Sequence, residues 1–181
     1  MKKLNLAYLV LVLFAGLAVA AAQQTDASSR TFVSFEPMST VSVAKGKSTP
    51  VVFHFRVKSG YHINSNRPTA EELIPTVMHF SLPGDVVIGR VVYPPGQLTS
   101  FPFNPNEKLS VYSGDVLIKA RVVAPESAAT GKYTIHAELK YQACDNNACY
   151  PPKKLPLVFD VSVGQGGKRS GAKARPTKTS P

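Results

Sequence analysis

The segment YTIHAELKYQ, residues 133–142, decides the fold class, because apolar or aromatic residues alternate with polar residues along its whole length. One face carries Tyr133, Ile135, Ala137, Leu139 and Tyr141. A period of two residues over such a length is typical of a β-strand with one buried face. The segment VVFHFRVK, residues 51–58, repeats the pattern with Val51, Phe53, Phe55 and Val57 on one side.

Shorter β-prone runs fill most of the remaining chain, at residues 31–35, 40–44, 76–82, 86–93, 110–124 and 155–163. Turn sequences rich in Pro and Gly separate them, and only TAEELI, residues 69–74, could form a helical turn. Seven or eight short strands of this kind predict a single all-β domain, an antiparallel β-sandwich. Two segments, 61–75 and 94–108, are predicted to be long loops, which are often functional in a small domain.

The two ends of the chain differ from this domain in composition. Residues 1–22 combine Lys2 and Lys3 with an apolar run and two A-x-A sites, which predicts a signal peptide cleaved after Ala20 or Ala22. The alternative is an uncleaved membrane anchor, although the run is short for that purpose. Residues 164–181 are rich in Gly, Ser, Pro and Lys, and predict a basic disordered tail. The folded domain is therefore expected over residues 23–163, in an exported and soluble protein without stable membrane insertion.

The basic charge belongs mainly to those two ends. The chain has 21 Lys and Arg against 11 Asp and Glu, a net charge of +10. Two of the basic residues lie in the signal segment and five in the tail, so the domain keeps 14 − 11 = +3. Nucleic-acid binding is therefore not expected. The tail is expected to be solvated, with docking to anionic lipid or cell wall as the alternative.

Cys144 and Cys149 are the only cysteines, and four residues separate them in YQACDNNACYPPKK, residues 141–154. In an exported protein such a pair is normally oxidised. A loop of about six residues would add only about 2 kcal/mol of stability. The residues alone therefore leave a structural staple and an exchange-active disulfide equally open.

Other sites and activities have less support in the sequence. A zinc site would need two more ligands, and His54, His62, His79 and His136 are scattered along the chain. His54 and His136 fall on the polar faces of their predicted strands, where a histidine is usually exposed to solvent rather than bound to a metal. We find no GxSxG, HExxH, P-loop or dinucleotide motif. No metal and no cofactor is therefore expected.

The cysteine segment resembles a known family. A strand ending in Tyr-Gln-Ala-Cys, a short loop and then Cys-Tyr-Pro-Pro is similar to the N-terminal periplasmic domain of the thiol:disulfide interchange protein DsbD. SGYHINS (59–65), VVYPPG (91–96) and YSGDVLI (112–118) occur in the same order as in that family. The resemblance extends from about Phe32 to Val163, and Cys-Tyr-Pro-Pro is its most specific element.

The resemblance implies an immunoglobulin-like β-sandwich in the periplasm whose disulfide passes electrons to thioredoxin-fold proteins. It implies that Cys149 forms the mixed disulfide and that Cys144 resolves it. It also implies a cap loop whose aromatic residue shields the disulfide. Phe103 is the cap candidate and Phe101 the substitute, with packing on the rim of the sandwich as the alternative. Tyr61 and Tyr150 are expected to line the same site.

Two features differ from the family pattern. The family member used for comparison has five residues between its cysteines, whereas this loop has four. No membrane segment and no thioredoxin-like domain follow residue 163, so a separate membrane electron carrier is expected to supply the reductant. The expected activity is thus thiol:disulfide interchange of the protein-disulfide reductase type. The alternative is a non-catalytic binding module of the same fold with a structural disulfide.

Overall fold

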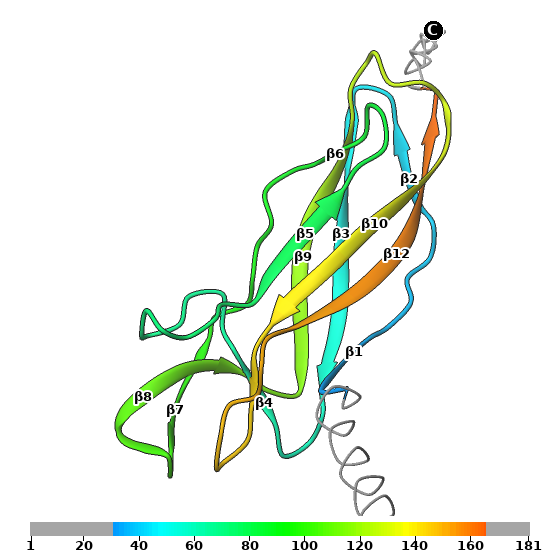
Figure 1. Cartoon of the computed structure of the whole chain (residues 1–181). Helices are drawn as coiled ribbons and strands as arrows, with labels where there is room; N and C mark the ends of the chain where they lie inside the picture. The colour runs from blue at the N-terminus through cyan, green and yellow to red at the C-terminus, as the bar shows by residue number, and fades with distance from the viewer. Residues whose placement is uncertain (1–30, 166–181) are drawn as a thin grey trace, which may run out of the picture. The chain divides into compact units, whose positions relative to one another are not determined.

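A computed structural model describes residues 31–165, which form strands and loops without any helix in this range. The first sheet has the order β1–β3–β9–β6, comprising β1 (Val33–Phe35), β3 (Lys47–Val57), β9 (Asp115–Ala124) and β6 (Val87–Ile88). The second has the order β2–β12–β10–β5, comprising β2 (Val41–Ala44), β12 (Lys153–Gly164), β10 (Gly131–Tyr141) and β5 (Val77–Ser81). The third has the order β11–β4–β8–β7, comprising β11 (Ala143–Cys144), β4 (His62–Asn64), β8 (Asn104–Tyr112) and β7 (Gln97–Phe101) (Figure 1).

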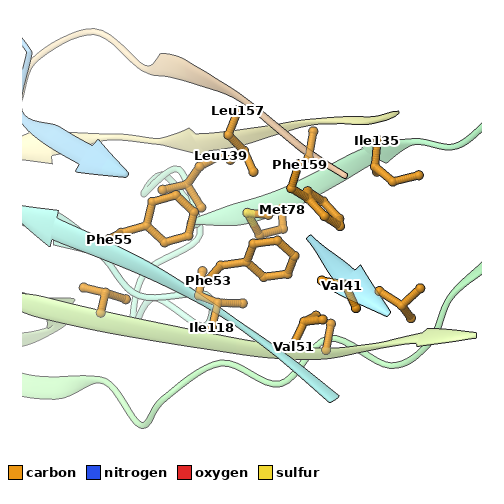
Figure 2. Close-up of a cluster of buried hydrophobic side chains, with 14 of the residues drawn as sticks. Val41, Val51, Phe53, Phe55, Met78, Ile118, Ile135, Leu139, Leu157 and Phe159 are labelled. Carbon is orange, nitrogen blue, oxygen red and sulfur yellow. The ribbon is translucent and has the colours of Figure 1, made fainter. Parts of the chain in front are cut away.

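The first two sheets face each other and enclose the main core. Phe53 of β3 is fully buried, and its ring centroid lies 5.3 Å from that of Phe159 on β12 and 5.7 Å from that of Phe80 on β5. Figure 2 shows Phe53 and Phe55 pointing from one sheet toward Leu157 and Phe159 on the other. The alternation in the sequence produces this packing, because every second side chain of β3 and β10 enters the core. The all-β, immunoglobulin-like sandwich predicted from the sequence is confirmed.

One strand pair departs from the antiparallel pattern. β2 runs parallel to β12, with Val41 opposite Val161 and Val43 opposite Val163, whereas the other strand pairs are antiparallel. A hydrophobic alternation is the same for either direction, so the sequence could not indicate it.

The third sheet corrects the prediction of a long loop over residues 94–108. Most of that segment forms the hairpin of β7 and β8, which lies at the same end of the sandwich as the loop between β10 and β12 (Figure 1). Pro102 sits in the turn, and Pro105 follows the irregularity in register near Ser100 and Phe101. Proline is tolerated at turns and irregular edge pairs, so its presence here did not prevent a hairpin.

Two other segments are less regular than predicted. TAEELI, residues 69–74, forms a turn with one backbone hydrogen bond from Leu73 to Ala70 but no helix. In the predicted strand 86–93 only β6 and a single bridge between Val92 and Lys119 pair with β9.

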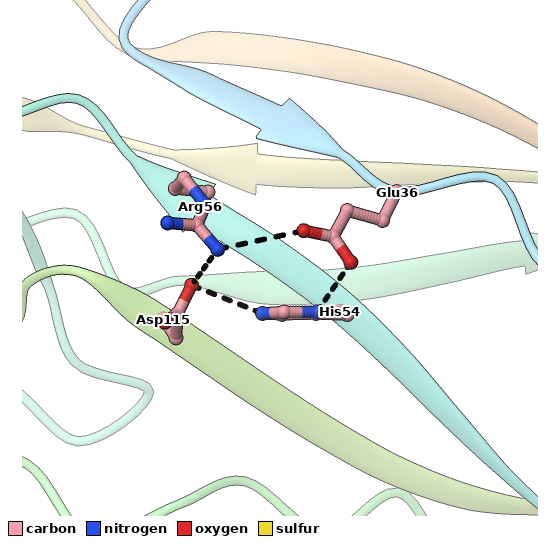
Figure 3. A network of polar contacts seen from close by, with 4 residues as sticks. All are labelled: Glu36, His54, Arg56 and Asp115. Atoms are coloured by element: carbon pink, nitrogen blue, oxygen red, sulfur yellow. Dashed lines mark hydrogen bonds and ion pairs between the residues drawn. The ribbon is translucent and has the colours of Figure 1, made fainter.

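On the outer face of the first sheet, His54 joins a network of charged side chains (Figure 3). Its Nδ1 lies 2.6 Å from Glu36, and its Nε2 lies 3.0 Å from Asp115. Arg56 lies 3.0 Å from Asp115 and 3.6 Å from Glu36. These contacts link β1, β3 and β9 across the sheet. His54 is thus half-buried in a network, whereas His136 is exposed as expected.

The predicted signal peptide over residues 1–22 lies outside the described residues, as does the tail from residue 166 onward. β12 continues through Gly164, one residue past the predicted end of the domain. Across residues 31–165, no helix has the length and hydrophobicity needed to cross a membrane.

Candidate functional site

Cys144 and Cys149 form a disulfide with an S–S distance of 2.04 Å. They face each other as an isolated antiparallel bridge between β11 and the chain leading into β12. The Tyr150 amide donates to the Ala143 carbonyl at 2.8 Å, and the Asp145 amide donates to the Ala148 carbonyl at 3.0 Å. These bonds flank the cysteines, which therefore form a non-hydrogen-bonded pair, the closer type of antiparallel pair. Their Cα atoms lie 3.9 Å apart.

Asp145 organises the short loop between the cysteines. Its Oδ1 accepts hydrogen bonds from the amides of Asn147 at 2.7 Å and Ala148 at 2.9 Å, as in an Asx-turn. Its Oδ2 accepts a hydrogen bond of 2.7 Å from the Tyr150 hydroxyl. The Tyr150 hydroxyl and the two amides hold the pKa of the Asp145 carboxyl below its usual range. The loop therefore carries a negative charge beside the disulfide.

The two cysteines differ in their access to solvent. Cys144 is 0% exposed at the end of β11, whereas Cys149 is exposed. Cys144 belongs to β11, which pairs with β4, whereas Cys149 lies outside the regular strands in the loop before β12. Cys149 is therefore the more solvent-accessible residue of the pair.

His62 lies directly opposite Cys144 in the pairing of β4 with β11. The residue is only 5% exposed, and its ring stacks on Phe101 with centroids 3.9 Å apart and planes 15° apart. Burial lowers the pKa of His62 to about 4, although the Asp145 carboxylate acts in the opposite direction. The imidazole is therefore neutral near pH 7. Its Nε2 is buried and has no hydrogen-bond partner.

The two cap candidates occupy different positions. Phe101, at the end of β7, is 8% exposed and covers His62. Phe103, in the hairpin turn, is 36% exposed and stacks on Phe101 with centroids 5.5 Å apart. Of the two, Phe101 is therefore the one that lies against the residue opposite Cys144.

Tyr61, Tyr150 and Phe32 form a second cluster of aromatic rings. The ring centroid of Phe32 lies 4.9 Å from that of Tyr61 and 4.8 Å from that of Tyr150, and the two tyrosines are 6.0 Å apart. Tyr150 follows Cys149 directly and bonds the Asp145 carboxylate. These tyrosines thus support the cysteine loop and partly pack against the main core.

Gln142 fixes the strand end from which the cysteine loop begins. Its Oε1 accepts hydrogen bonds from the Asn64 amide at 3.1 Å and the Ile74 backbone amide at 3.2 Å. Its Nε2 donates to the Tyr150 carbonyl at 3.2 Å. One side chain therefore ties β4, the segment before β5 and the cysteine loop together.

Among the described residues, no cluster of three or more His, Cys, Asp or Glu side chains is arranged to hold a metal ion. His62 stands alone beside the disulfide, while His54, His79 and His136 belong to the two large sheets. The arrangement of Cys144, Cys149 and His62 offers a disulfide and an imidazole as its reactive groups.

The family comparison agrees with this geometry. The family model of the N-terminal domain of the thiol:disulfide interchange protein DsbD matches residues 29–157, which is most of the chain. The chain belongs to the DsbD N-terminal domain family. A disulfide-bonded cysteine pair in this family fits thiol:disulfide exchange in general. The search of curated proteins found no match.

Three solved structures illustrate the range of similar folds. The N-terminal domain of Neisseria meningitidis DsbD in the reduced form is 23% identical, with a TM-score of 0.39, covering 64% of this chain and 77% of that one. A family 123 glycoside hydrolase from Clostridium perfringens is 13% identical, with a TM-score of 0.38, covering 75% of this chain and 28% of that one. PapD-like domain 7 of human CEP192 is 9% identical, with a TM-score of 0.35, covering 83% of this chain and 98% of that one. Because these TM-scores are low, the assignment rests on the family match.

Sequence reasoning missed three residues of this site. Asp145 and Gln142 stood in the quoted cysteine segment, and His62 stood in SGYHINS, residues 59–65. The sequence signal for His62 was available, because that element was already part of the family pattern. Its pairing with Cys144 depends on the register of β4 and β11, which two short strands do not reveal.

Proposed function

We propose that this DsbD N-terminal domain exchanges thiol and disulfide with protein partners through Cys144 and Cys149. The observation that carries the proposal is the unequal burial of the two cysteines in a bond at the edge of the sandwich. A staple needs neither sulfur to be accessible. Exchange requires that a thiolate reach one sulfur along the axis of the bond, and the exposed Cys149 meets this condition.

In this mechanism the thiolate of a reductant attacks Cys149 Sγ. A new disulfide forms between the reductant and Cys149, and the Cys144–Cys149 bond breaks, leaving its electron pair on Cys144. A second thiol of the reductant then attacks its own sulfur in the mixed disulfide and releases Cys149 as a thiolate. The reduced domain reacts with an oxidised partner in reverse order, with Cys149 as the nucleophile and Cys144 as the resolving thiol.

The partners would be thioredoxin-fold proteins of the periplasm, and a separate membrane electron carrier would supply the reductant. Phe101 would shield the site together with Phe103 until a partner docks. Support for this assignment comes from Phe101, which covers His62 while the more exposed Phe103 covers Phe101. Tyr61 and Tyr150 would complete the lining on the opposite side of the cysteine loop.

The first test is the reduction potential of the disulfide in the purified domain, measured by thiol labelling across a graded dithiol buffer. An exchange-active bond should lie above about −300 mV, whereas structural disulfides in secreted proteins typically lie below that value. A potential well below it would favour the alternative, a non-catalytic binding module with a structural disulfide.

The second test assigns the two cysteines. Cys144→Ala leaves Cys149 able to form a mixed disulfide that cannot be resolved, so it should trap thioredoxin-fold partners from a periplasmic extract. Cys149→Ala is the matched control and should trap few, because Cys144 is buried. Trapping only by Cys149→Ala would reverse the roles, and trapping by neither variant would contradict the relay.

A further inference from the structure

The imidazole of His62 and the sulfur of Cys144 share one face of the third sheet. The two residues are directly opposed in the pairing of β4 with β11. Directly opposed side chains in an antiparallel pair have Cβ atoms about 4.5–5.5 Å apart and point to the same side. Both residues are buried, His62 with 5% and Cys144 with 0% exposure.

The His62 Nε2 atom is a buried nitrogen without a hydrogen-bond partner. Buried polar atoms are nearly always hydrogen-bonded, and an exception often marks a functional site. In the oxidised protein Cys144 is bonded to Cys149 and carries no proton. Reduction turns Cys144 into a thiol or a thiolate, and either form can bond an imidazole nitrogen.

The elements packed around His62 supply few competing charges. On the β11 side the charged group is Asp145, whose carboxylate favours a positive imidazole. On the β7 side Phe101 stacks on the ring. On the β8 side the titratable group is Tyr112, which pairs with Ile63. Its hydroxyl donates to Asn66 Oδ1 at 2.7 Å, and the Pro94 carbonyl lies 3.0 Å from the same oxygen. Both Asp145 carboxylate oxygens already accept hydrogen bonds, from two amides and the Tyr150 hydroxyl, whereas His62 Nε2 has no partner and is the unoccupied basic atom of this group.

We propose that, once the disulfide is reduced, His62 Nε2 and Cys144 Sγ share one proton. This inference rests on the proposed exchange function and assigns the base for its resolving thiol. Reduction adds two electrons and two protons to the pair of cysteines. One proton goes to Cys149, and the other lies between Cys144 and His62, either as thiol and imidazole or as thiolate and imidazolium.

His62 assists Cys144 in both directions: in the oxidised protein it stabilises the departing thiolate, and in the reduced protein the shared proton raises the fraction of Cys144 present as thiolate. When a reductant attacks Cys149, the electron pair released to the buried Cys144 meets an N–H donor or a proton on His62. When Cys144 resolves a mixed disulfide, its proton passes to His62 and its thiolate attacks Cys149 Sγ. The partner then leaves as a thiolate and takes a proton from the imidazolium or from water. Rates of both steps depend on the pKa of the departing or attacking thiol.

The decisive experiment follows the four histidine rings by NMR from pH 3.5 to 8.5, in the oxidised domain and after reduction with dithiothreitol. In the oxidised protein His62 should titrate near the low value set by burial, about 4. After reduction its midpoint should rise by at least about one pH unit, because the thiolate favours the charged ring. The ring signals of His79 and His136, which lie on the second sheet, serve as internal controls.

An unchanged His62 midpoint in the reduced protein would overturn the proposal. Because dithiothreitol replaces the protein partner, this result is independent of the relay. A shifted midpoint in a domain that traps no partner would leave the proton pair in place and contradict only the proposed function.

A variant pair provides a kinetic test. His62→Gln keeps a polar side chain that cannot titrate, and His136→Gln removes an exposed histidine from the second sheet. Reduction by dithiothreitol at pH 7 should slow by about tenfold in His62→Gln, a modest general-acid effect on the departing Cys144 thiolate. It should remain unchanged in His136→Gln. A folded His62→Gln domain with the wild-type rate and the wild-type pH profile would contradict the role of His62.

Discussion

The interior between the two large sheets and the interior around β4 differ in chemistry. The core of the sandwich contains buried apolar side chains from both sheets. The buried polar side chains of the described residues instead gather on β4 and its neighbours, namely His62, Asn64, Ser65, Thr76 and Ser110. The two buried side-chain atoms recorded without a partner, His62 Nε2 and Asn64 Oδ1, both belong to β4.

This difference separates stability from chemistry within one small domain. Apolar packing stabilises the sandwich, whereas the region around β4 accepts unsatisfied polar atoms, which cost about 1–3 kcal/mol each. That region lies beside the disulfide, because β4 pairs directly with β11. Changes in the first region should therefore alter stability, and changes in the second should alter the behaviour of Cys144 and Cys149.

The largest effect on stability is expected from Phe53→Ala. Phe53 is fully buried between the sheets and contacts Phe80 and Phe159, so its removal leaves a cavity. The free energy of unfolding should fall by about 3–5 kcal/mol in a urea titration. The reduction potential of the folded variant should stay at the wild-type value. A changed potential would show that the two regions are coupled through the core.

The sequence predicted the sandwich region well, for a physical reason. Long strands such as β3 and β10 carry many alternating residues, so each one identifies its own buried face. Cys144 and Cys149 were candidates because they are the only cysteines in the sequence, and the resemblance of their segment to a known family favoured exchange over a staple. The region around β4 was predicted poorly, since strands of two and three residues carry almost no periodicity.

The choice between Phe101 and Phe103 shows the same limit. Both lie in one predicted loop with prolines, and composition cannot indicate which ring enters the interior. Phe101 follows directly on an irregularity in the register of β7 and β8, and its ring stacks on His62. Such irregularities arise from the pairing of distant segments rather than from local propensity.

A smaller effect is expected when the pH falls, and it should arise around β4. Burial holds the pKa of His62 at about 4 in the folded protein, below its usual value of 6.5. The unfolded chain therefore binds this proton first, so stability is lost as the pH falls from about 6.5 through about 4. The loss should reach about 2–3 kcal/mol from His62.

Urea titrations between pH 7 and pH 3.5 would measure this loss, and His62→Gln is the matched variant. Asp145 acts in the same direction, because its lowered pKa means that its hydrogen bonds weaken as it becomes protonated. The wild type should lose more stability than the variant over this range. Equal slopes would mean that the His62 ring is already solvated in the folded protein.

The two aromatic candidates for the cap give a smaller and sharper contrast. Phe101→Ala removes a buried ring from His62 and should cost about 1.5–3 kcal/mol of stability. It should also speed reduction of the disulfide by a small phosphine or thiol. Phe103→Ala removes a more exposed ring, so its effect on both quantities should be smaller. A larger rate increase in Phe103→Ala would make Phe103 the main shield.

The smallest effect is expected in the network on the outer face of the first sheet. Asp115→Asn keeps the shape of the side chain but removes its charge from His54 and Arg56 (Figure 3). Because these side chains are partly exposed, the loss should be below about 1 kcal/mol and should shrink at high salt. Glu138→Gln, which loses the contact of 2.9 Å with Lys154 on the second sheet, is the matched control. The disulfide should be reduced at the wild-type rate in both variants, since neither side chain contacts β4 or the cysteine loop. A slower rate in Asp115→Asn would extend the reactive region into the first sheet.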